Sequence, residues 1–407
     1  MGASTYEIVR RDIEAAGARS ASSREYRTAL IRQLRQALPI EAACCTVVDP
    51  ATLLSTGAVT EDRVEAMHDR LFENEYLEED YNKYARLAAS PEHTATLSGA
   101  TQGLPERSLR YRDILRPEGF GDELRAALVS DGVCWGFLTL FRRLEDGLFR
   151  EEERQYVCSL VPVMAQGLRK QCLTLSAEEP EKMTMDTGLL VLSGSLNTLL
   201  SNEAGDYWLG QLRHWERISS PTLPRPIRAV ASRARSGLLP QSDGIGRLEA
   251  PPGTSPSSPA MAASVPSETA VAPAPPRVCI RTPHGQFLSI RASVLSGGSG
   301  QVQQLGIWVE QAKPGEILPL LAEAYGLSPR EKQILGKLLQ GFSTKELAEA
   351  LHISAYTVQD HMKSIFIKTG TASRRELVWP LLSRYSLPYG QEEEAGRGAT
   401  DSRLPLC

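Results

Sequence analysis

Three polar side chains near the carboxyl end of the chain, Gln359, Asp360 and Lys363, can together read the edges of DNA bases. Glutamine pairs with N6 and N7 of adenine, lysine donates to O6 and N7 of guanine, and a carboxylate accepts from N4 of cytosine. On an isolated helix such a group is more often a solvated face, so its meaning depends on the elements that position it.

The surrounding sequence predicts a helix that presents these three side chains outward. Apolar residues recur at helical spacing between them and assign the other side of the helix to a core: Val358, Met362, Ile365 and Phe366. Gln359, Asp360 and Lys363 then fall together on the outer face.

Repeated start signals indicate that this helix belongs to a compact group. Serine followed three positions later by glutamate begins at Ser328, Ser343 and Ser373, and this capping box satisfies the free N–H groups of a helix start. Pro329 suits the first helical position, and Gly341 suits a left-handed helix end. We therefore expect four short helices across residues 327–378.

The connection between the second and third helices defines the expected geometry. Only residues 352–353 lie between the second helix and Ser354, the N-cap of the third, and helices joined so closely cross steeply, as in a helix-turn-helix. At the start of the second helix, Ser343, Thr344 and Lys345 are expected to contact DNA phosphate, because free N–H groups and the helix dipole favour an anion there.

Three residues at the start of the third helix are further candidates for phosphate contact: Ser354, Thr357 and His361. Ser354, like Ser343, is expected to cap its helix first and to touch DNA second. For His361 a capping or packing role is an equally good interpretation. Such contacts position a protein on DNA, whereas base contacts specify the sequence.

The pattern of residues 327–378 matches a known motif at many positions. The matching residues are Ser328-Pro329-Arg330-Glu331, Leu335, Gly341, Ser343, Lys345-Glu346-Leu347-Ala348, Leu351, Ile353-Ser354, Thr357-Val358, His361, Ile365, Lys368, Gly370 and Ser373-Arg374. On these residues the segment resembles the DNA-binding domain of the LuxR-type transcription regulators. The family usually has a basic residue where this chain has Gln359, and a neutral one is more common than Asp360, so the resemblance leaves the target sequence open.

The charge of this domain is only weakly positive. Between residues 320 and 384 nine lysines and arginines accompany six acids, and the whole chain carries a formal net charge of -4. Because affinity for DNA comes largely from neutralised phosphates, one copy should bind weakly, and a homodimer is expected. Two such domains would place their half-site centres about 10 bp apart on double-stranded DNA.

The preceding part of the chain is interrupted by a segment rich in proline, serine, alanine and glycine. Residues 219–276 cannot bury enough apolar surface to offset their conformational entropy, so we expect a disordered insertion. Before it, residues 23–38 and 149–168 have helical spacing, and Asp131-Gly132 between two β-prone runs predicts a hairpin with a type I′ turn.

Two aromatic groups in this region have alternative interpretations. Trp135 and Phe137 are alternate residues of one predicted strand, so they are expected on one face, where core packing is favoured over lining a ligand pocket. The aromatic and acidic run at residues 72–84 fits a lid and an ordinary amphipathic helix equally well.

These patterns predict a multidomain protein. Segments such as VDPATLLSTGAVT and GVCWGFLTLFR are similar to the GAF-like sensor module of actinobacterial regulators of this type, and MDTGLLVLSGSLNTLLSNEAGDYWL with RVCIRTPHGQFLSIRAS suggests a PAS-like unit. We expect an α+β GAF-like domain followed by a small PAS-like α+β unit in two pieces, and an all-α four-helix helix-turn-helix domain. The expected boundaries are 1–175 for the GAF-like domain, 180–218 and 277–312 for the PAS-like unit, 219–276 for the insertion, 318–386 for the helix-turn-helix domain and 387–407 for a disordered tail.

No sequence pattern favours catalysis, a metal or a cofactor. The six histidines are scattered, and the seven cysteines form no CxxC pair, so they are expected to be reduced structural thiols. A metal or redox role for the adjacent Cys44 and Cys45 is the weaker alternative. The sequence thus favours a protein that is not an enzyme, and the competing hypothesis is a sensor or scaffold that acts only through protein partners.

The first twenty residues lack the apolar core of a signal peptide, and the most apolar run, residues 188–200, is shorter than the roughly 20 residues that span a bilayer. A cytoplasmic location without membrane contact is therefore expected. Besides double-stranded DNA and a second copy, candidate partners are a small-molecule effector of the GAF-like domain and RNA polymerase.

Overall fold

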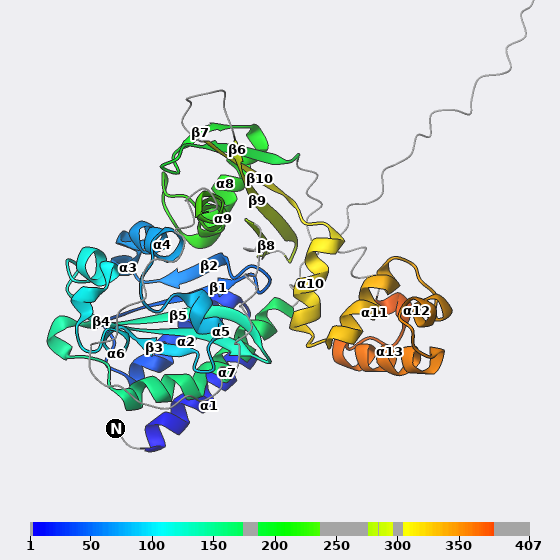
Figure 1. Ribbon diagram of the computed structural model, residues 1–407, viewed down its shortest axis with the longest axis horizontal. Helices are drawn as coiled ribbons and strands as arrows, with labels where there is room; N and C mark the ends of the chain where they lie inside the picture. The colour runs from blue at the N-terminus through cyan, green and yellow to red at the C-terminus, as the bar shows by residue number, and fades with distance from the viewer. Residues whose placement is uncertain (1–2, 174–185, 237–275, 284, 296–303, 378–407) are drawn as a thin grey trace, which may run out of the picture.

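The computed structural model describes residues 3–173, 186–236, 276–283, 285–295 and 304–377. Figure 1 shows two sheet-containing units that lie against each other and a separate group of helices, joined to them through α10 (Pro314–Ala324). The prediction of several domains, with an N-terminal α/β region and a C-terminal helical domain, is confirmed.

The first unit contains a five-stranded antiparallel sheet in the order β2-β1-β5-β4-β3. Its strands are β1 (Ala42–Val48), β2 (Ser55–Thr60), β3 (Thr94–Thr96), β4 (Phe120–Ser130) and β5 (Val133–Arg143). The predicted hairpin joins β4 and β5, and its turn residues Asp131 and Gly132 have φ of +53° and +76°, as a type I′ turn requires.

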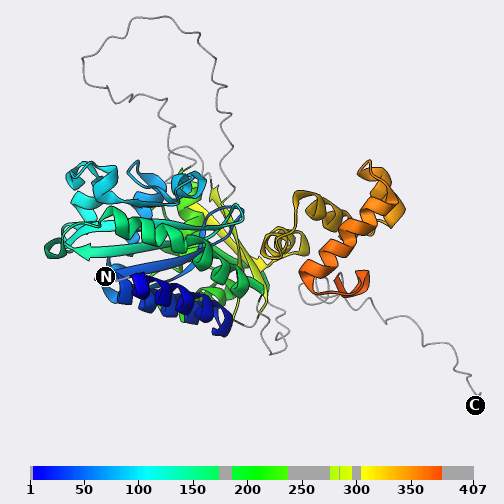
Figure 2. The ribbon, with the colours of Figure 1, turned by 90° about the horizontal axis from the view of Figure 1, so that it is seen from below.

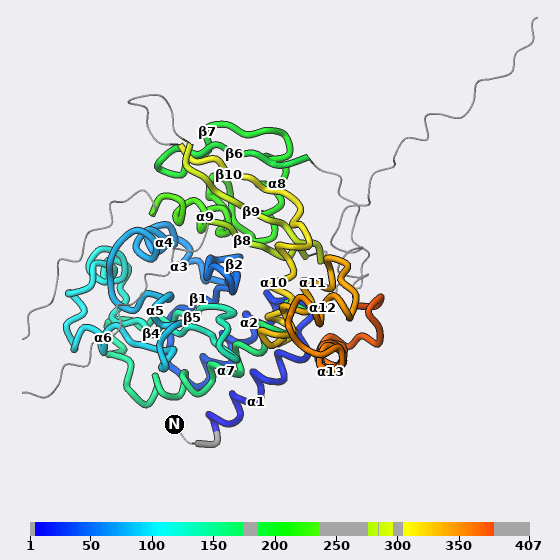
Figure 3. The backbone as a smooth tube through the Cα atoms, turned by 45° about the vertical axis from the view of Figure 1, so that its right-hand side comes forward, coloured from blue at the N-terminus to red at the C-terminus, as the bar shows by residue number. Residues whose placement is uncertain are grey.

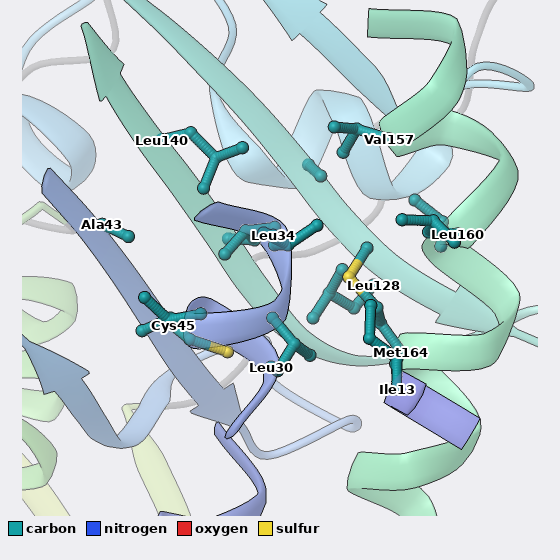
Figure 4. Close-up of a cluster of buried hydrophobic side chains, with 14 of the residues drawn as sticks. Ile13, Leu30, Leu34, Ala43, Cys45, Leu128, Leu140, Val157, Leu160 and Met164 are labelled. Carbon is teal, nitrogen blue, oxygen red and sulfur yellow. The ribbon is translucent and has the colours of Figure 1, made fainter. Parts of the chain in front are cut away.

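Helices cover both faces of this sheet. One face packs on α1 (Ala3–Arg19), α2 (Ser23–Ala37) and α7 (Glu151–Leu173), and Figure 4 shows Leu30, Leu128 and Met164 meeting in this core. The predicted helices at residues 23–38 and 149–168 are confirmed. The other face carries shorter helices: α3 (Asp62–Ala66), α4 (His68–Leu77), α5 (Tyr84–Ala89), α6 (Leu97–Ala100) and the turns η1 (Pro105–Arg107), η2 (Tyr111–Leu115) and η3 (Leu144–Asp146).

The run at residues 72–84 is not one helix. Its first part, residues 72–77, completes α4, and Tyr84 begins α5 after a loop. Phe72 is buried in the middle of α4, and it joins the apolar core of the second unit. The amphipathic-helix interpretation therefore holds for the first half of the run alone.

Trp135 and Phe137 pack on opposite faces of the sheet, so the expectation of a shared face is wrong. Leu128 pairs with Gly136 whereas Val129 pairs with Cys134, which leaves Trp135 as an extra residue in a β-bulge. Trp135 is buried in the core beneath α1, α2 and α7. Phe137 stacks on Tyr84 of the other face and lines a cavity of about 60 Å³.

The second unit repeats the same strand plan. Its antiparallel strands have the order β7-β6-β10-β9-β8, which is the order of the first sheet when the strands are counted within each unit. These strands are β6 (Gly188–Leu192), β7 (Thr198–Ser201), β8 (Arg277–Arg281), β9 (Phe287–Leu295) and β10 (Gln304–Gln311). Between β7 and β8 lies α8 (Glu203–Glu216).

A further helix, α9 (Arg225–Ser236), corrects the prediction that residues 219–276 are disordered throughout. Ile227 and Val230 are fully buried in the core of the second sheet. Arg225 is buried too, and its Nη1 lies 2.7 Å from an oxygen of Glu216. The prediction of disorder rests on the average composition of the long segment. That average does not register these twelve residues, whose apolar side chains have helical spacing. Residues 237–275 lie outside the described residues.

The helix α10 lies between the sheet units and the C-terminal helices, as Figures 2 and 3 show from two sides. Its Ala324 packs in the core of the first unit beneath α7. Ile317 and Leu321 pack with Cys279 and Phe287 of the second unit, whereas Ala322 packs with the C-terminal helices. The helix begins at Pro314, four residues before the boundary expected at 318. In the described part of the chain no helix has the length and apolar character that crossing a membrane requires.

The C-terminal group contains α11 (Pro329–Leu339), α12 (Thr344–Ala350) and α13 (Ala355–Thr369). Helical backbone begins again at residue 374 after Ser373, which accepts a hydrogen bond from the backbone N–H of Glu376 at 3.2 Å. The extent of that fourth helix, together with the tail expected at 387–407, lies outside the described residues.

The close contact between α2 and α7 yields a first prediction. Gly167 of α7 lies so near the buried ring of Tyr26 that a Cβ at this position would collide with it. We expect Gly167→Ala to lower the free energy of unfolding by about 2 kcal/mol, because a rigid buried ring must shift. In Gly210→Ala the new Cβ meets open space on α8, and stability should rise by about 0.5 kcal/mol. Urea unfolding followed by circular dichroism measures both, and equal effects would refute this account.

Candidate nucleic-acid interface

The first helix of the C-terminal group begins and ends as its sequence predicts. The Ser328 hydroxyl accepts from the Glu331 N–H at 3.3 Å, and the Glu331 carboxylate accepts from the Ser328 N–H at 2.6 Å. At the other end Gly341 has a φ of +93°, and Gly341 and Phe342 donate to the carbonyls of Leu338 and Lys337. This Schellman motif ends α11, and the left-handed backbone at its end turns the chain toward α12.

The Glu331 carboxylate also links α11 to α13. It is buried, and it accepts hydrogen bonds from the Ser364 hydroxyl and from the Lys368 ammonium group, both at 2.7 Å. Burial raises the pKa of Glu331, but the hydrogen bonds from Lys368, Ser364 and Ser328 outweigh burial and lower the pKa to about 2. One side chain thus caps α11 and fixes the position of α13.

The turn into α13 is held by similar means. Ser343 and Glu346 form a second capping box at the start of α12, with distances of 3.3 and 2.7 Å. At its end, the Arg330 guanidinium donates to the Leu351 carbonyl at 2.5 Å, and His352 takes a left-handed φ of +54°. The Ser354 hydroxyl then caps α13 by accepting from the Thr357 N–H at 3.0 Å. The predicted short turn and caps are confirmed.

The three residues predicted to contact base edges lie on the exposed face of α13. Gln359 is exposed, and the side chains of Asp360 and Lys363 are 49% and 69% exposed. Asp360 and Lys363 form an ion pair with an N–O distance of 3.4 Å. An exposed ion pair of this kind contributes little to the free energy of folding, so either group can leave the pair and contact a base instead. Val358 and Ile365 are fully buried on the opposite side.

The predicted phosphate contacts divide into two groups. Lys345 is exposed at the start of α12, and Thr344 beside it is half-buried. The hydroxyls of Ser343 and Ser354 act as N-caps, which is the role expected of them first. Thr357 and His361 are half-buried, and the Thr357 hydroxyl lies 2.8 Å from that of Ser354. The structure holds no DNA, so all six phosphate contacts stay predictions.

Sequence reasoning missed two apolar members of the exposed face of α13. Tyr356 is 71% exposed and Ile367 is 82% exposed, although both have large apolar side chains. Together with Asp360 and Lys363 they have helical spacing along one stripe. The same spacing in the sequence could have predicted their exposure, because the inward side of the helix was already assigned to other residues. Tyr356 lies in the first turn of α13 and extends the candidate base-reading surface.

The cysteines of the described chain are free thiols, most of them buried. Burial raises the pKa of Cys45 and of Cys134 to about 12, so both remain protonated near neutral pH. Among the described residues, no histidine, cysteine, aspartate or glutamate side chains gather in a group that could hold a metal ion. The adjacent Cys44 and Cys45 therefore have no further ligands there.

The comparison with protein families decides the nature of the C-terminal group. Residues 326–379 match the family of bacterial regulatory proteins, luxR family. The C-terminal domain is a LuxR-family helix-turn-helix domain. Curated relatives match it over a similar stretch: the transcriptional regulator MalT of Yersinia pestis is 32% identical over 72 residues, which are 18% of this chain and 8% of MalT. The regulatory protein MctR of Rhizobium johnstonii is 37% identical over 70 residues, 17% of this chain and 30% of MctR.

Solved structures resemble the chain only distantly. The Vibrio cholerae VqmA dimer, a structure described in terms of LuxR-type receptors, is 15% identical and covers 49% of this chain and 84% of its own, with a TM-score of 0.19. The Escherichia coli DhaR(N)-DhaL complex is 12% identical and covers 77% of this chain and 91% of its own, with a TM-score of 0.23.

The buried Glu331 predicts a pH dependence of this domain. The pKa of Glu331 in the folded chain, about 2, lies below its ordinary value of 4.5, so its stabilising effect is present above pH 4.5 and is lost as the pH falls toward 2. We expect Glu331→Gln to lower the stability of the domain by about 3 kcal/mol near pH 7, and the difference from wild type to shrink in that window.

Urea unfolding followed through the NMR amide signals of α13 measures this difference at each pH. The matched control is Glu349→Gln, which alters an exposed acid on α12 and should leave stability nearly unchanged. A wild-type advantage over Glu331→Gln that is the same at pH 7 and pH 2.5 would contradict the role given to Glu331.

Proposed function

We propose that this protein is a transcription regulator that binds double-stranded DNA through α13. The observation that carries the proposal is the exposed polar stripe of Gln359, Asp360 and Lys363 on the third helix of a LuxR-family domain. These side chains would contact base edges in the major groove. Ser343, Thr344, Lys345, Ser354, Thr357 and His361 would contact phosphates and set the position of the domain.

The two units before this domain would form the sensory part. Their shared strand order supports the resemblance to sensor modules, GAF-like for residues 1–175 and PAS-like for the second sheet, which is now extended by α9. The cavity of about 60 Å³ beside Phe137 is also lined by the buried Arg125 and the half-buried Glu75, whose side chains lie 2.5 Å apart. The sensory part would bind a small effector or contact a partner. A cavity of this size is too small to enclose a drug-sized ligand, for which sites begin near roughly 300 Å³.

A homodimer is part of the proposal because the isolated domain has little excess positive charge. Two copies would bind half-sites with centres about 10 bp apart, and RNA polymerase is a further candidate partner. The protein would regulate without catalysing a reaction. The alternative is a sensor or scaffold that acts only through protein partners, and loss of DNA binding in a folded variant separates the two.

A charge reversal on the exposed face of α13 tests the proposal. Lys363→Glu should weaken binding to a mixed-sequence DNA duplex at low salt by about 10-fold or more, because it replaces a favourable contact with repulsion. Arg32→Glu makes the same charge change on the exposed face of α2 and serves as the control, with binding expected to stay within about 2-fold. Fluorescence anisotropy measures affinity, while circular dichroism and sedimentation check folding and oligomeric state.

The same titration followed by NMR locates the contact. Amide signals of α13, residues 355–369, should shift on adding the duplex, whereas those of α2 should not. If Lys363→Glu binds DNA as well as wild type and the α13 signals stay in place, the partner-only alternative replaces the regulator.

A further inference from the structure

A second and larger cavity, of about 280 Å³, lies where the two sheet units meet α10. Its walls come from α2, β1 and β2 of the first unit, from α8 and β8 of the second, and from Leu320 of α10. Figure 3 shows α10 beside α7 and below β8. Small-molecule sites are concave, mostly apolar and frequent at domain boundaries, and their volumes begin near roughly 300 Å³. The cavity has the place and the size of such a site.

Guanidinium groups dominate the charge around this cavity. Among the described residues that line it, Arg24, Arg27 and Arg281 are cationic and Glu216 is the one acid. That acid is already engaged, because its oxygen lies 2.7 Å from Nη1 of Arg225. The lining thus has an excess of positive charge, and the cavity favours an anionic group over a cationic one.

Arg27 supplies the strongest part of this charge. The residue is only 8% exposed, and its Nε and Nη1 donate to the carbonyls of Ser23, Cys45 and Gly57 at 3.1, 3.3 and 3.1 Å. Within the described residues, no carboxylate pairs with Arg27 and no acceptor is bonded to its Nη2. Burial lowers the pKa of Arg27, but an arginine in a protein keeps its proton. A buried cation without a counter-ion is costly, and an anion in the cavity would remove that cost.

Two further features of the walls agree with an anionic ligand. The first turn of α2, capped by Ser22, lines the cavity and contributes the positive end of a 15-residue helix. Facing walls contain the thiols of Cys172 and Cys279, and burial raises the pKa of both, that of Cys172 to about 11. They remain neutral at physiological pH and do not repel an anion.

We propose that this cavity binds a small organic carboxylate with an apolar body. The carboxylate would lie against Arg27 and Arg24, and the body against Leu212, Trp215 and Ile280. The role of this ligand as an effector rests on the proposed function, since an occupant would touch Leu320 of α10, the helix that leads into the LuxR-family domain. The binding itself requires only the cavity.

Three probes with one apolar body and different charge test the proposal on the full chain. Phenylacetate should bind saturably by isothermal titration calorimetry with a Kd of about 1 mM or tighter. The neutral phenylacetamide should bind about 10-fold more weakly, and the cationic phenethylammonium should not bind detectably. The fluorine NMR signal of 5-fluorotryptophan at Trp215, assigned by Trp215→Phe, should shift with phenylacetate and place the probe in the cavity.

Variants of α2 identify the groups that hold the carboxylate. Arg27→Met should lower phenylacetate affinity by about 10-fold or more. Because that variant also loses three backbone contacts, Arg24→Met is the second test, for the Arg24 side chain makes no hydrogen bond within the described residues and its loss should weaken binding without unfolding. Arg32→Met on the exposed face of α2 is the matched control and should bind like wild type.

The proposal is overturned if phenylacetamide binds as tightly as phenylacetate, if no saturable binding of phenylacetate occurs by about 10 mM, or if Arg24→Met leaves its affinity unchanged. Lys363→Glu separates this result from the proposed function, since that variant should lose DNA binding and keep phenylacetate binding. If the wild-type chain binds the DNA duplex but not phenylacetate, the cavity proposal alone has failed. If it binds phenylacetate but not the duplex, the proposed function alone has failed.

Discussion

The steep crossing of α12 and α13 depends on two charged residues of α11, the buried Glu331 and the half-buried Arg330. Glu331 ties the start of α11 to α13 through Ser364 and Lys368, and the neighbouring Arg330 holds the last carbonyl of α12. Charges taken from water are tolerated only when hydrogen bonds replace the lost hydration. Because the partners of Glu331 and Arg330 all lie inside the domain, the residues on the outer face of α13 take no part in holding the helix and can contact other molecules.

The same balance explains how the two sheet units fit together. They share one strand order, and α9 of the second unit also contacts β2 and α4 of the first. The buried guanidinium of Arg225 meets Glu216 from its own unit and Glu65 from the other, so the junction contains paired charges. Where no acid accompanies the cation, as at Arg27, the structure has a cavity instead. The paired Arg225 thus belongs to a structural contact, whereas Arg27, which pairs with no carboxylate among the described residues, belongs to a candidate binding site.

A single helix carries the connection from these units to the LuxR-family domain. The apolar residues of α10 divide among three cores: Ala324 joins that of the first unit, Ile317 and Leu321 that of the second, and Ala322 that of the C-terminal helices. Leu320 lines the cavity of about 280 Å³ and also a further cavity at the start of β5. Because Leu320 lies on α10, an occupant of either cavity would contact the helix that leads into the LuxR-family domain.

Neighbouring residues in the sequence are enough to specify the local elements of this protein. The capping boxes at Ser328 and Ser343, the Asp131-Gly132 turn and the helical spacing around Val358 fixed the helix-turn-helix, the hairpin and the outward stripe, because each depends on residues a few positions apart. Tertiary structure alone decided that Trp135 bulges, that α9 orders within a proline-rich segment and that Arg27 faces a cavity. Those outcomes depend on partners from distant segments, and local spacing contains no information about them.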